Sequence, residues 1–247
     1  MMNAIKAEFR KVISVRSTYF IIALSTAIII FIAGFIEGFH NDPKALQSAD
    51  LLASESRGAI VFVGIVFAFV ALLLAAHEYR YNTITYTLAN TTRRNKILAA
   101  KFIVITVFAV LTSLFVTFFS PLCTLIGVHL AGHTLAPQTF DTWQLVWRCV
   151  VCGWGYAMYA FILAIALRNQ VGAIVTFLLV PLIGENILTL WVKGNSKYLP
   201  FTALQSVAAP TDLGNHTNSI FQLKVVLVYV VVGLIISAVL FNRRDAN

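Results

Sequence analysis

Residues 77–101 read HEYRYNTITYTLANTTRRNKILAAK, the one long polar and basic segment between two strongly apolar ones. The apolar run before it covers residues 58–76, and the run after it covers residues 102–128. Apolar runs of about 20 residues span the hydrocarbon core of a bilayer as helices. A polar segment tied at both ends to such helices must lie against one face of the membrane.

The composition places the chain among integral membrane proteins. Of its 247 residues, 59% are hydrophobic and 11% are charged, whereas a soluble domain carries about 25% charged residues. The apolar runs are continuous and do not alternate with polar residues, which predicts helices rather than a barrel. We expect an all-α, polytopic membrane protein, one transmembrane domain over residues 1–247, with six transmembrane helices at 18–39, 58–76, 102–128, 149–167, 171–192 and 220–241.

Two of these runs contain residues that disturb helices. The third run is long enough to need a tilt or a break, and Pro121 could supply the break. The fifth run contains Pro181 and Gly184, and we expect it to be the only span broken near its middle. A secondary transporter built from inverted repeats would show such breaks at matching places in both halves.

The first sixteen residues form an amphipathic pattern. Apolar residues recur at helical spacing while basic residues lie off that stripe, which is typical of a helix lying in the membrane interface. A short helix packed on protein is the alternative. The apolar positions are Met2, Ile5, Phe9, Val12 and Ile13, and the basic ones are Lys6, Arg10 and Lys11.

Basic residues set the predicted orientation, because they are enriched on the cytoplasmic side. The side that carries both termini and the 77–101 stretch holds twelve of the eighteen, and the other side holds six, so both termini are predicted to be cytoplasmic. The net charge of +8 then reflects topology and anionic lipid, and it does not imply nucleic acid. The six outer basic residues are Lys44, Arg57, Arg148, Lys193, Lys197 and Lys224.

The motifs of common catalytic and metal sites are missing. No G-x-x-x-x-G-K-[ST] occurs, so this chain does not cradle a nucleotide by that route. Cys149 and Cys152 have no second cysteine pair to complete a zinc site, and they read as small hydrophobes. His129 and His133 lack a third ligand nearby and read as loop residues. We predict no catalytic residue, metal site or cofactor in this chain.

The polar stretch carries a recognisable pattern. Glu78-x-Arg80-x-x-Thr83-Ile84-x-x-x-Leu88 is followed by Thr92-Arg93-Arg94-x-x-Ile97-Leu98-x-x-Lys101. This resembles the first cytoplasmic loop of ABC exporter permeases of the second permease class (the six-helix, type 2 exporter family). Asn82 stands where those sequences commonly have glycine, and Thr92-Arg93 stands where they commonly have Ser-Arg. The amphipathic start, the six spans and Tyr198-Leu199-Pro200-Phe201 before the last span extend the resemblance over nearly the whole chain.

The resemblance implies a function in ATP-driven transport. In that family this loop forms a coupling helix between the second and third spans and docks on a separate ABC ATPase subunit, which binds the ATP and magnesium. Two permeases, as a homodimer or a pair of related chains, form the pathway with two ATPases. The implied protein is a plasma (inner) membrane permease that exports its substrate and is not itself an enzyme. The apolar interior of the spans favours an amphipathic substrate over small ions. The implied ATPase contacts are Glu78, Arg80, Thr83, Ile84, Leu88, Arg93, Arg94 and Lys101.

The end of the fifth span is a candidate outward gate. Glu185 is an ionisable residue within an apolar run, where a charge is costly and points to function. We expect it to face a wet cavity or to pair with a base such as Lys193 or Lys224; a plain helix end with a snorkelling glutamate is the alternative. Residues 198–207 are too apolar for a free loop and too short to span, which predicts a re-entrant or interfacial piece. The gate residues are Pro181, Glu185, Leu199, Pro200 and Phe201.

Two other functional classes remain open on the sequence. One is a channel or secondary transporter that needs no ATPase. The other is a structural membrane protein, such as an anchor or an immunity factor that sequesters a peptide. An ATPase encoded in a neighbouring reading frame would favour the exporter.

Overall fold

The computed structural model describes residues 2–40, 45–80, 94–192, 195–208 and 219–243, and every regular element within these ranges is a helix. Six helical stretches are long and apolar enough to cross a membrane, which confirms the all-α, multi-pass prediction. They are Arg16–Phe39, Leu51–His77, Asn95–Leu130, Thr142–Leu167, Gln170–Val192 and Ser219–Phe241.

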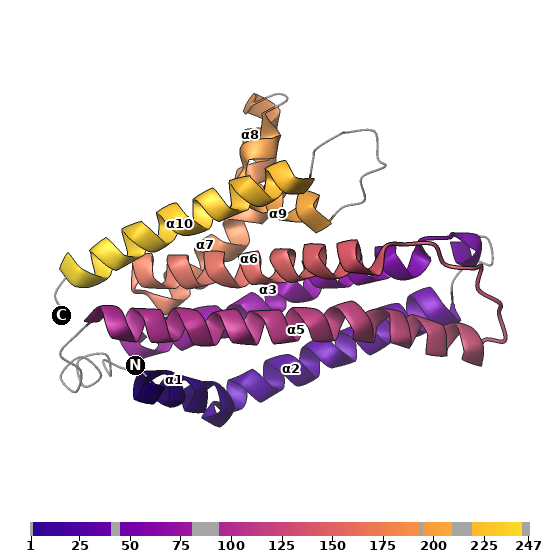
Figure 1. The fold of residues 1–247 in the computed structure, drawn as a ribbon, viewed down its shortest axis with the longest axis horizontal. Helices are drawn as coiled ribbons and strands as arrows, with labels where there is room; N and C mark the ends of the chain where they lie inside the picture. Colours follow the sequence, from indigo (N-terminus) through magenta and orange to yellow (C-terminus); the bar gives the residue numbers. More distant parts are fainter. Residues whose placement is uncertain (1, 41–44, 81–93, 193–194, 209–218, 244–247) are drawn as a thin grey trace.

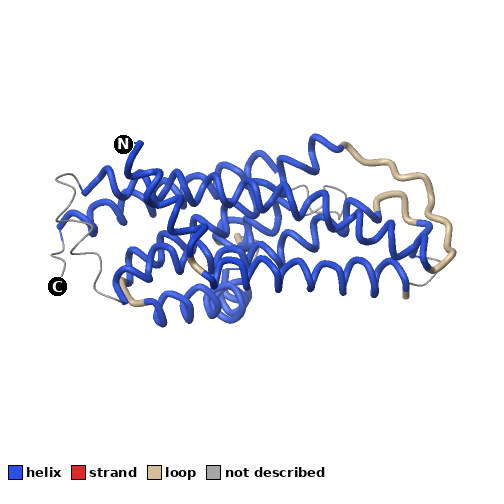
Figure 2. Tube along the Cα trace, turned by 90° about the horizontal axis from the view of Figure 1, so that it is seen from below, coloured by secondary structure: helices blue, strands red, loops and turns tan. Residues whose placement is uncertain are grey.

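The long helices run side by side along one axis of the molecule (Figures 1 and 2). The amphipathic start is α1 (Met2–Ser14), and the first span consists of α2 (Arg16–Ile29) and the π-helical segment η1 (Ile30–Phe39). The next three spans are α3 (Leu51–Arg80), α5 (Arg94–Leu130) and α6 (Thr142–Leu167). The short 3-10 turn η2 (Ala45–Gln47) precedes α3.

The fifth span is built from three pieces, α7 (Gln170–Leu179), the π-helical η3 (Val180–Gly184) and α8 (Glu185–Val192). It bends at η3, so that α8 projects sideways from the bundle (Figure 1). A 3-10 turn, η4 (Ser196–Tyr198), and a short helix, α9 (Pro200–Ala208), follow before the last span, α10 (Ser219–Arg243).

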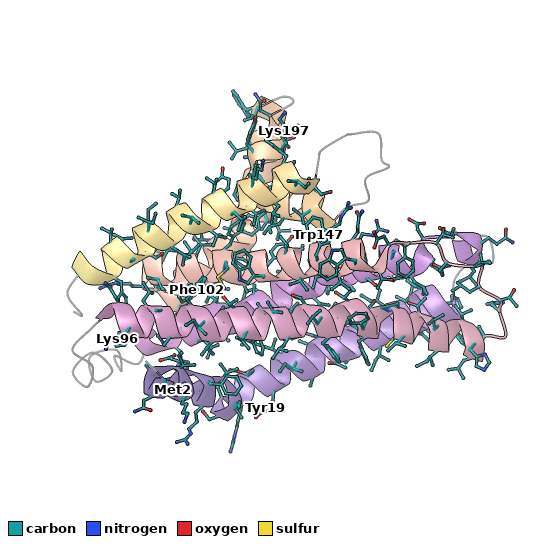
Figure 3. All side chains as sticks on the ribbon, viewed as in Figure 1. Met2, Tyr19, Lys96, Phe102, Trp147 and Lys197 are labelled. Carbon is teal, nitrogen blue, oxygen red and sulfur yellow. The ribbon has the colours of Figure 1, made fainter. Side chains whose placement is uncertain are left out.

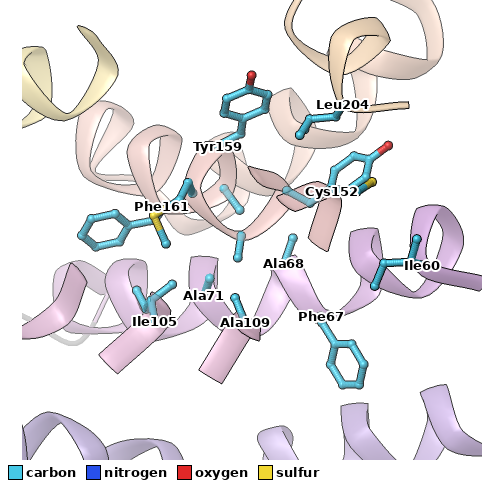
Figure 4. Close-up of a cluster of buried hydrophobic side chains, with 14 of the residues drawn as sticks. Ile60, Phe67, Ala68, Ala71, Ile105, Ala109, Cys152, Tyr159, Phe161 and Leu204 are labelled. Carbon is cyan, nitrogen blue, oxygen red and sulfur yellow. The ribbon is translucent and has the colours of Figure 1, made fainter. Parts of the chain in front are cut away.

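The centre of the bundle is formed by α3 and α6. In their most apolar 18 residues, 61% of α6 and 56% of α3 are buried, against 17% in the first, fifth and sixth spans. The α3–α6 contact is lined by small side chains (Figure 4). Small residues let helix backbones approach closely, which stabilises helix packing in lipid. The small buried residues are Ala68, Ala71, Ala75, Ala76, Cys149, Cys152, Gly153, Ala157, Ala160 and Ala164.

Helix α5 runs without interruption through Pro121, contrary to the expectation of a break there. Proline has no N–H, so it leaves the carbonyl of the residue four positions earlier, Thr117, without its helical partner. The hydroxyl of Ser56 on α3 lies 3.0 Å from that carbonyl oxygen and 2.9 Å from the carbonyl of Leu52, and it donates between them. A neighbouring hydroxyl thus satisfies the backbone group that proline frees, which keeps the helix intact in an apolar setting.

The first span departs from the prediction as well, because it is π-helical over Ile30–Phe39. The expectation that only the fifth span is broken is therefore wrong. The wall that η1 presents to α5 is glycine-lined. A Cβ added to Gly127 would lie 2.0 Å from the carbonyl oxygen of Gly34 and 2.9 Å from the Cα of Gly38, so only glycine fits there. The first and fifth spans do not correspond in a chain divided into two halves of three spans, so these breaks do not form the matched pair of an inverted repeat.

Candidate functional site

At one end of the bundle, α1 is attached to α5 by a buried ion pair. The ammonium of Lys101 lies 2.9 Å from Oε2 of Glu8, and both side chains are only 6% exposed. Lys11 contacts the other oxygen of Glu8 at 2.7 Å from a more exposed position. One carboxylate therefore holds two ammonium groups and joins the first helix to the start of the third span.

The apolar side chains of α1 divide between the protein and the outside. Val12 is buried, whereas Met2, Phe9 and Ile13 are exposed. Met2 lies on the outer side of the bundle, as does Tyr19 at the start of α2 (Figure 3). The helix thus packs on α5 and also presents an apolar strip outward. Contact of that strip with lipid remains a prediction.

The predicted coupling helix lies outside the described residues. Thr83, Ile84, Leu88 and Arg93 fall in the 81–93 gap, and the side chains of Glu78, Arg80 and Arg94 are likewise outside the described part. Among the predicted ATPase contacts, Lys101 alone has a described side chain, and it is directed at Glu8 within the chain. The end of α3 and the start of α5 lie at the same end of the bundle as α1 and the end of α10 (Figure 1).

At the fifth span, the structure brings the predicted gate residues together. Pro181 lies in η3, and Glu185 follows as the first residue of α8. The carboxylate of Glu185 accepts three hydrogen bonds of 2.7 Å from the start of α9: from the N–H of Phe201, the N–H of Thr202 and the hydroxyl of Thr202. Glu185 is only 4% exposed, so these bonds form in a dry environment.

The sequence around α9 explains why it needs a distant cap. The first N–H groups of a helix have no partner within the helix and need one from outside. Pro200 occupies the first helical position, where its missing N–H costs nothing. Leu199 precedes it with an apolar side chain that cannot cap. Glu185, sixteen residues before Phe201, supplies the acceptor, and its charge is favoured by the positive end of the helix dipole.

Aromatic rings surround this cap. The ring of Phe201 lies 5.3 Å from that of Tyr159 and 5.6 Å from that of Phe177. The hydroxyl of Tyr159 donates to the carbonyl of Pro200 at 3.4 Å, and that of Tyr229 donates to the carbonyl of Tyr198 at 2.9 Å. Phe201 therefore sits in a pocket formed by α6 and α7, and α10 holds the turn before it.

This geometry corrects the expectations for Glu185. It faces neither a wet cavity nor Lys224, and it does not snorkel; Lys193 lies outside the described residues. The segment predicted to be a re-entrant or interfacial piece contains the helix α9, with five buried residues packed against α6 and α10. Its position relative to the membrane remains a prediction. Its gating role remains a prediction.

Sequence reasoning missed two partners in these sites. Glu8 is the single acidic residue among the first sixteen, which was a usable signal for a buried pair. Thr202 follows a proline at a helix start that lacks a capping side chain, which was a usable signal for a distant cap. Within the described residues, no three histidine, cysteine or acidic side chains gather as metal ligands would.

Comparisons with known proteins give a family and no activity. No curated protein matches the chain. One family model matches residues 11–246, which is nearly the whole sequence and includes all six spans. The chain therefore belongs to the family described as "Protein of unknown function (DUF2705)".

Proposed function

We propose that this chain is the transmembrane subunit of an ATP-driven ABC exporter. The observation that carries the proposal is the 77–101 stretch, whose sequence resembles a coupling loop and whose flanking helices pack against each other and against α6. Helix α3, which precedes the stretch, packs along α6, and helix α5, which follows it, packs on both α3 and α6. A push on the stretch would therefore act on the centre of the fold.

The proposed mechanism is a rigid-body switch. ATP and magnesium are bound and hydrolysed in the partner ATPase, and the coupling loop converts the movement of that subunit into rotation of α3 and α5. The ion pair between Glu8 and Lys101 makes α1 move together with α5. Two copies, or this chain and a related permease, enclose the pathway. In this proposal both termini are cytoplasmic, the plasma membrane is the location, and the cargo is amphipathic.

The outward gate in this proposal is the contact between Glu185 and α9. Helix η3 contains Pro181, which lacks a backbone donor, so the fifth span can bend there without breaking a regular hydrogen bond. Helix α9 lies between α6 and α10. A change in the bend at η3 would move Glu185 and pull the start of α9 with it, which would open the outer end.

The coupling assignment is tested with Leu88→Asp. A charge buried at a docking surface costs several kcal/mol, so this variant should lose association with its ATPase and lose transport. The matched control is Leu130→Asp, which places the same charge at an exposed residue at the opposite end of α5. The measurement is copurification with the proposed ATPase partner, sought among Walker-motif proteins encoded in neighbouring reading frames. Normal assembly and transport by Leu88→Asp would show that the docking assignment is wrong.

The gate is tested by cysteine accessibility in a cysteine-free background. Leu204 is fully buried in this structure, so a cysteine at 204 should resist an impermeant maleimide added from outside. Trapping the complex with ATP should make positions 185, 199 and 204 react faster. Position 190 is exposed on α8 and serves as the control that reacts in both states. Labelling that is identical in both nucleotide states would remove the gate role.

A further inference from the structure

A pocket opens between the first span, α3 and α5, at the end of the bundle opposite the 77–101 stretch. Its volume is about 200 Å³. Two carboxylates line it, Glu37 from η1 and Glu55 from α3, together with the hydroxyl-bearing residues Ser54 and Ser120. Every other lining residue is apolar or glycine. The combination of acidic groups and an apolar wall is unusual for a place within membrane-spanning helices, where ionisable residues mark functional sites.

Two polar groups in this pocket lack partners among the described residues. Ser120 is 0% exposed, and its hydroxyl makes no hydrogen bond there. The carboxylate of Glu55 forms no ion pair with any residue that the structure describes. Its basic neighbour, Arg57, contacts Asp50 at 3.7 Å and the carbonyl of Ala53 at 2.9 Å. A buried polar group without a partner costs free energy, which applies to the Ser120 hydroxyl. Glu55 is half-buried at the pocket, so both groups are available to a ligand that enters it.

The wall of the pocket is held firmly. One side is η1, and π-helical turns are frequent at functional sites. The glycine contacts of Gly34 and Gly38 with Gly127 fix that segment against α5. The rim is open toward the outside of the bundle, because Ile32 and Phe62 line the pocket and are also substantially exposed. A molecule could therefore enter sideways, with its apolar part along these side chains.

We propose that this pocket binds an amphipathic cation, with an ammonium head against Glu55 and an apolar tail along Ile32 and Phe62. The ammonium N–H groups would donate to the carboxylate of Glu55 and to the hydroxyl oxygen of Ser120. Glu37 adds a second negative charge at the same pocket. A divalent metal fits poorly, since calcium takes six to eight oxygen ligands and the pocket is mainly apolar. The inference goes beyond the exporter proposal, because binding concerns this chain alone, without ATP or an ATPase.

Binding is measured with tritiated dodecylamine on the full chain in phosphatidylcholine nanodiscs, with empty nanodiscs as the background. We expect saturable binding that unlabelled dodecylamine displaces and dodecanol does not. Glu55→Gln should weaken binding about tenfold or more, since a hydrogen bond to a charged group is lost. Ser120→Ala should weaken it by a smaller factor. Asp141→Asn, which removes an exposed acid outside the pocket and keeps a capping oxygen, should bind as the wild type does.

A second variant separates shape from charge. A Cβ added at Gly58 meets no atom within 4 Å, and Gly58 lines the pocket, so Gly58→Leu should fill the cavity while keeping the fold and both carboxylates. It should abolish binding with an unchanged melting temperature. Binding by Glu55→Gln or Gly58→Leu as tight as that of the wild type would overturn the proposal. Equal displacement by dodecanol, displacement by sodium or calcium, or no binding above empty nanodiscs would also overturn it. None of these results depends on transport, so the exporter proposal would stand or fall separately.

Discussion

Two regions of the molecule, the contact of α1 with α5 and the start of α8, each bury one glutamate, and the two carboxylates have different kinds of partner. Glu8 meets charges, the ammonium groups of Lys101 and Lys11. Glu185 meets neutral dipoles, two backbone N–H groups and one hydroxyl. A lost charge partner leaves an uncompensated buried ion, whereas lost backbone donors are left unsatisfied but neutral. The first contact should therefore act as a permanent anchor, and the second as a contact that a conformational change can break.

The largest effect is expected when the ion pair is broken. Glu8→Gln removes the carboxylate charge that the buried ammonium of Lys101 contacts at 2.9 Å, and it should cost about 3–5 kcal/mol of unfolding free energy. Denaturant titration in detergent micelles, followed by tryptophan fluorescence, measures it. Adding Lys101→Met should restore most of the loss, because both charges are then gone. Asp50→Asn, which breaks the exposed contact with Arg57, is the control and should cost less than 1 kcal/mol. An equally small loss for Glu8→Gln would contradict a buried pair.

A smaller and more local effect is expected at Glu185. Glu185→Gln keeps one acceptor oxygen and loses the charge, so it should cost about 1.5–3 kcal/mol. Hydrogen exchange should speed up most at the amides of Phe201 and Thr202, since these donate to the carboxylate. Uniform acceleration across the bundle, with no concentration in α9, would show that Glu185 is a general core residue rather than the cap of that helix.

The next largest effect is expected at Ser56, a neutral side chain that donates a hydrogen bond to a backbone carbonyl. Ser56→Ala removes the hydroxyl that serves the carbonyl of Thr117 below Pro121, and it should cost about 1–2 kcal/mol because the acceptor is left unsatisfied. In a Pro121→Ala background the helix regains its own donor, so the same change should cost clearly less. Identical costs in both backgrounds, measured by the same titration, would remove the link between Ser56 and Pro121.

The smallest effect is expected at an exposed cap. Asp141 accepts hydrogen bonds from the N–H groups of Trp143 and Gln144 at 2.9 and 3.3 Å, in contact with solvent. Asp141→Ala should cost about 1 kcal/mol or less. Glu185 and Asp141 both cap a helix with a carboxylate, so the ratio of their costs measures what burial adds. A larger loss at Asp141 than at Glu185 would reverse the order that burial predicts.

The spans could be predicted from the sequence because the length and apolar composition of each run favour its transfer into lipid, whatever its tertiary contacts. Their ends could not be, because helices continue past the apolar part. Helix α3 begins at Leu51, whereas the apolar run begins at Gly58. The sequence therefore predicted a loop at Glu55 and did not indicate that Glu55 lies on α3 beside η1. The unbroken course of α5 through Pro121 depends on Ser56, which lies 61 residues away from Thr117 in the chain.

The candidate sites were predictable in part for the same reason. Glu185 stood out because a lone acid within an apolar run is expensive wherever its partner lies. The identity of that partner depends on how η3 bends and where α9 packs, which a single sequence does not contain. Glu8 and Lys101 are 93 residues apart, so neither pointed to the other. Tertiary geometry decided each pairing, whereas local composition decided each span.

The central position of α6 bears on how the protein is made. Ribosomes add residues from the N-terminus at about 5–20 per second, so α3 and α5 enter the bilayer seconds before α6 is complete. During that interval the alanine-lined face of α3 is uncovered, and so are the side chains on α5 that α6 later covers. Ser113 is one of them, because its hydroxyl lies where a Cβ on Gly153 would be. The first half of the chain is thus inserted with helix faces that are later buried still uncovered. Until residue 167 has been synthesised, the insertion machinery or the other early helices must cover the exposed faces of α3 and α5.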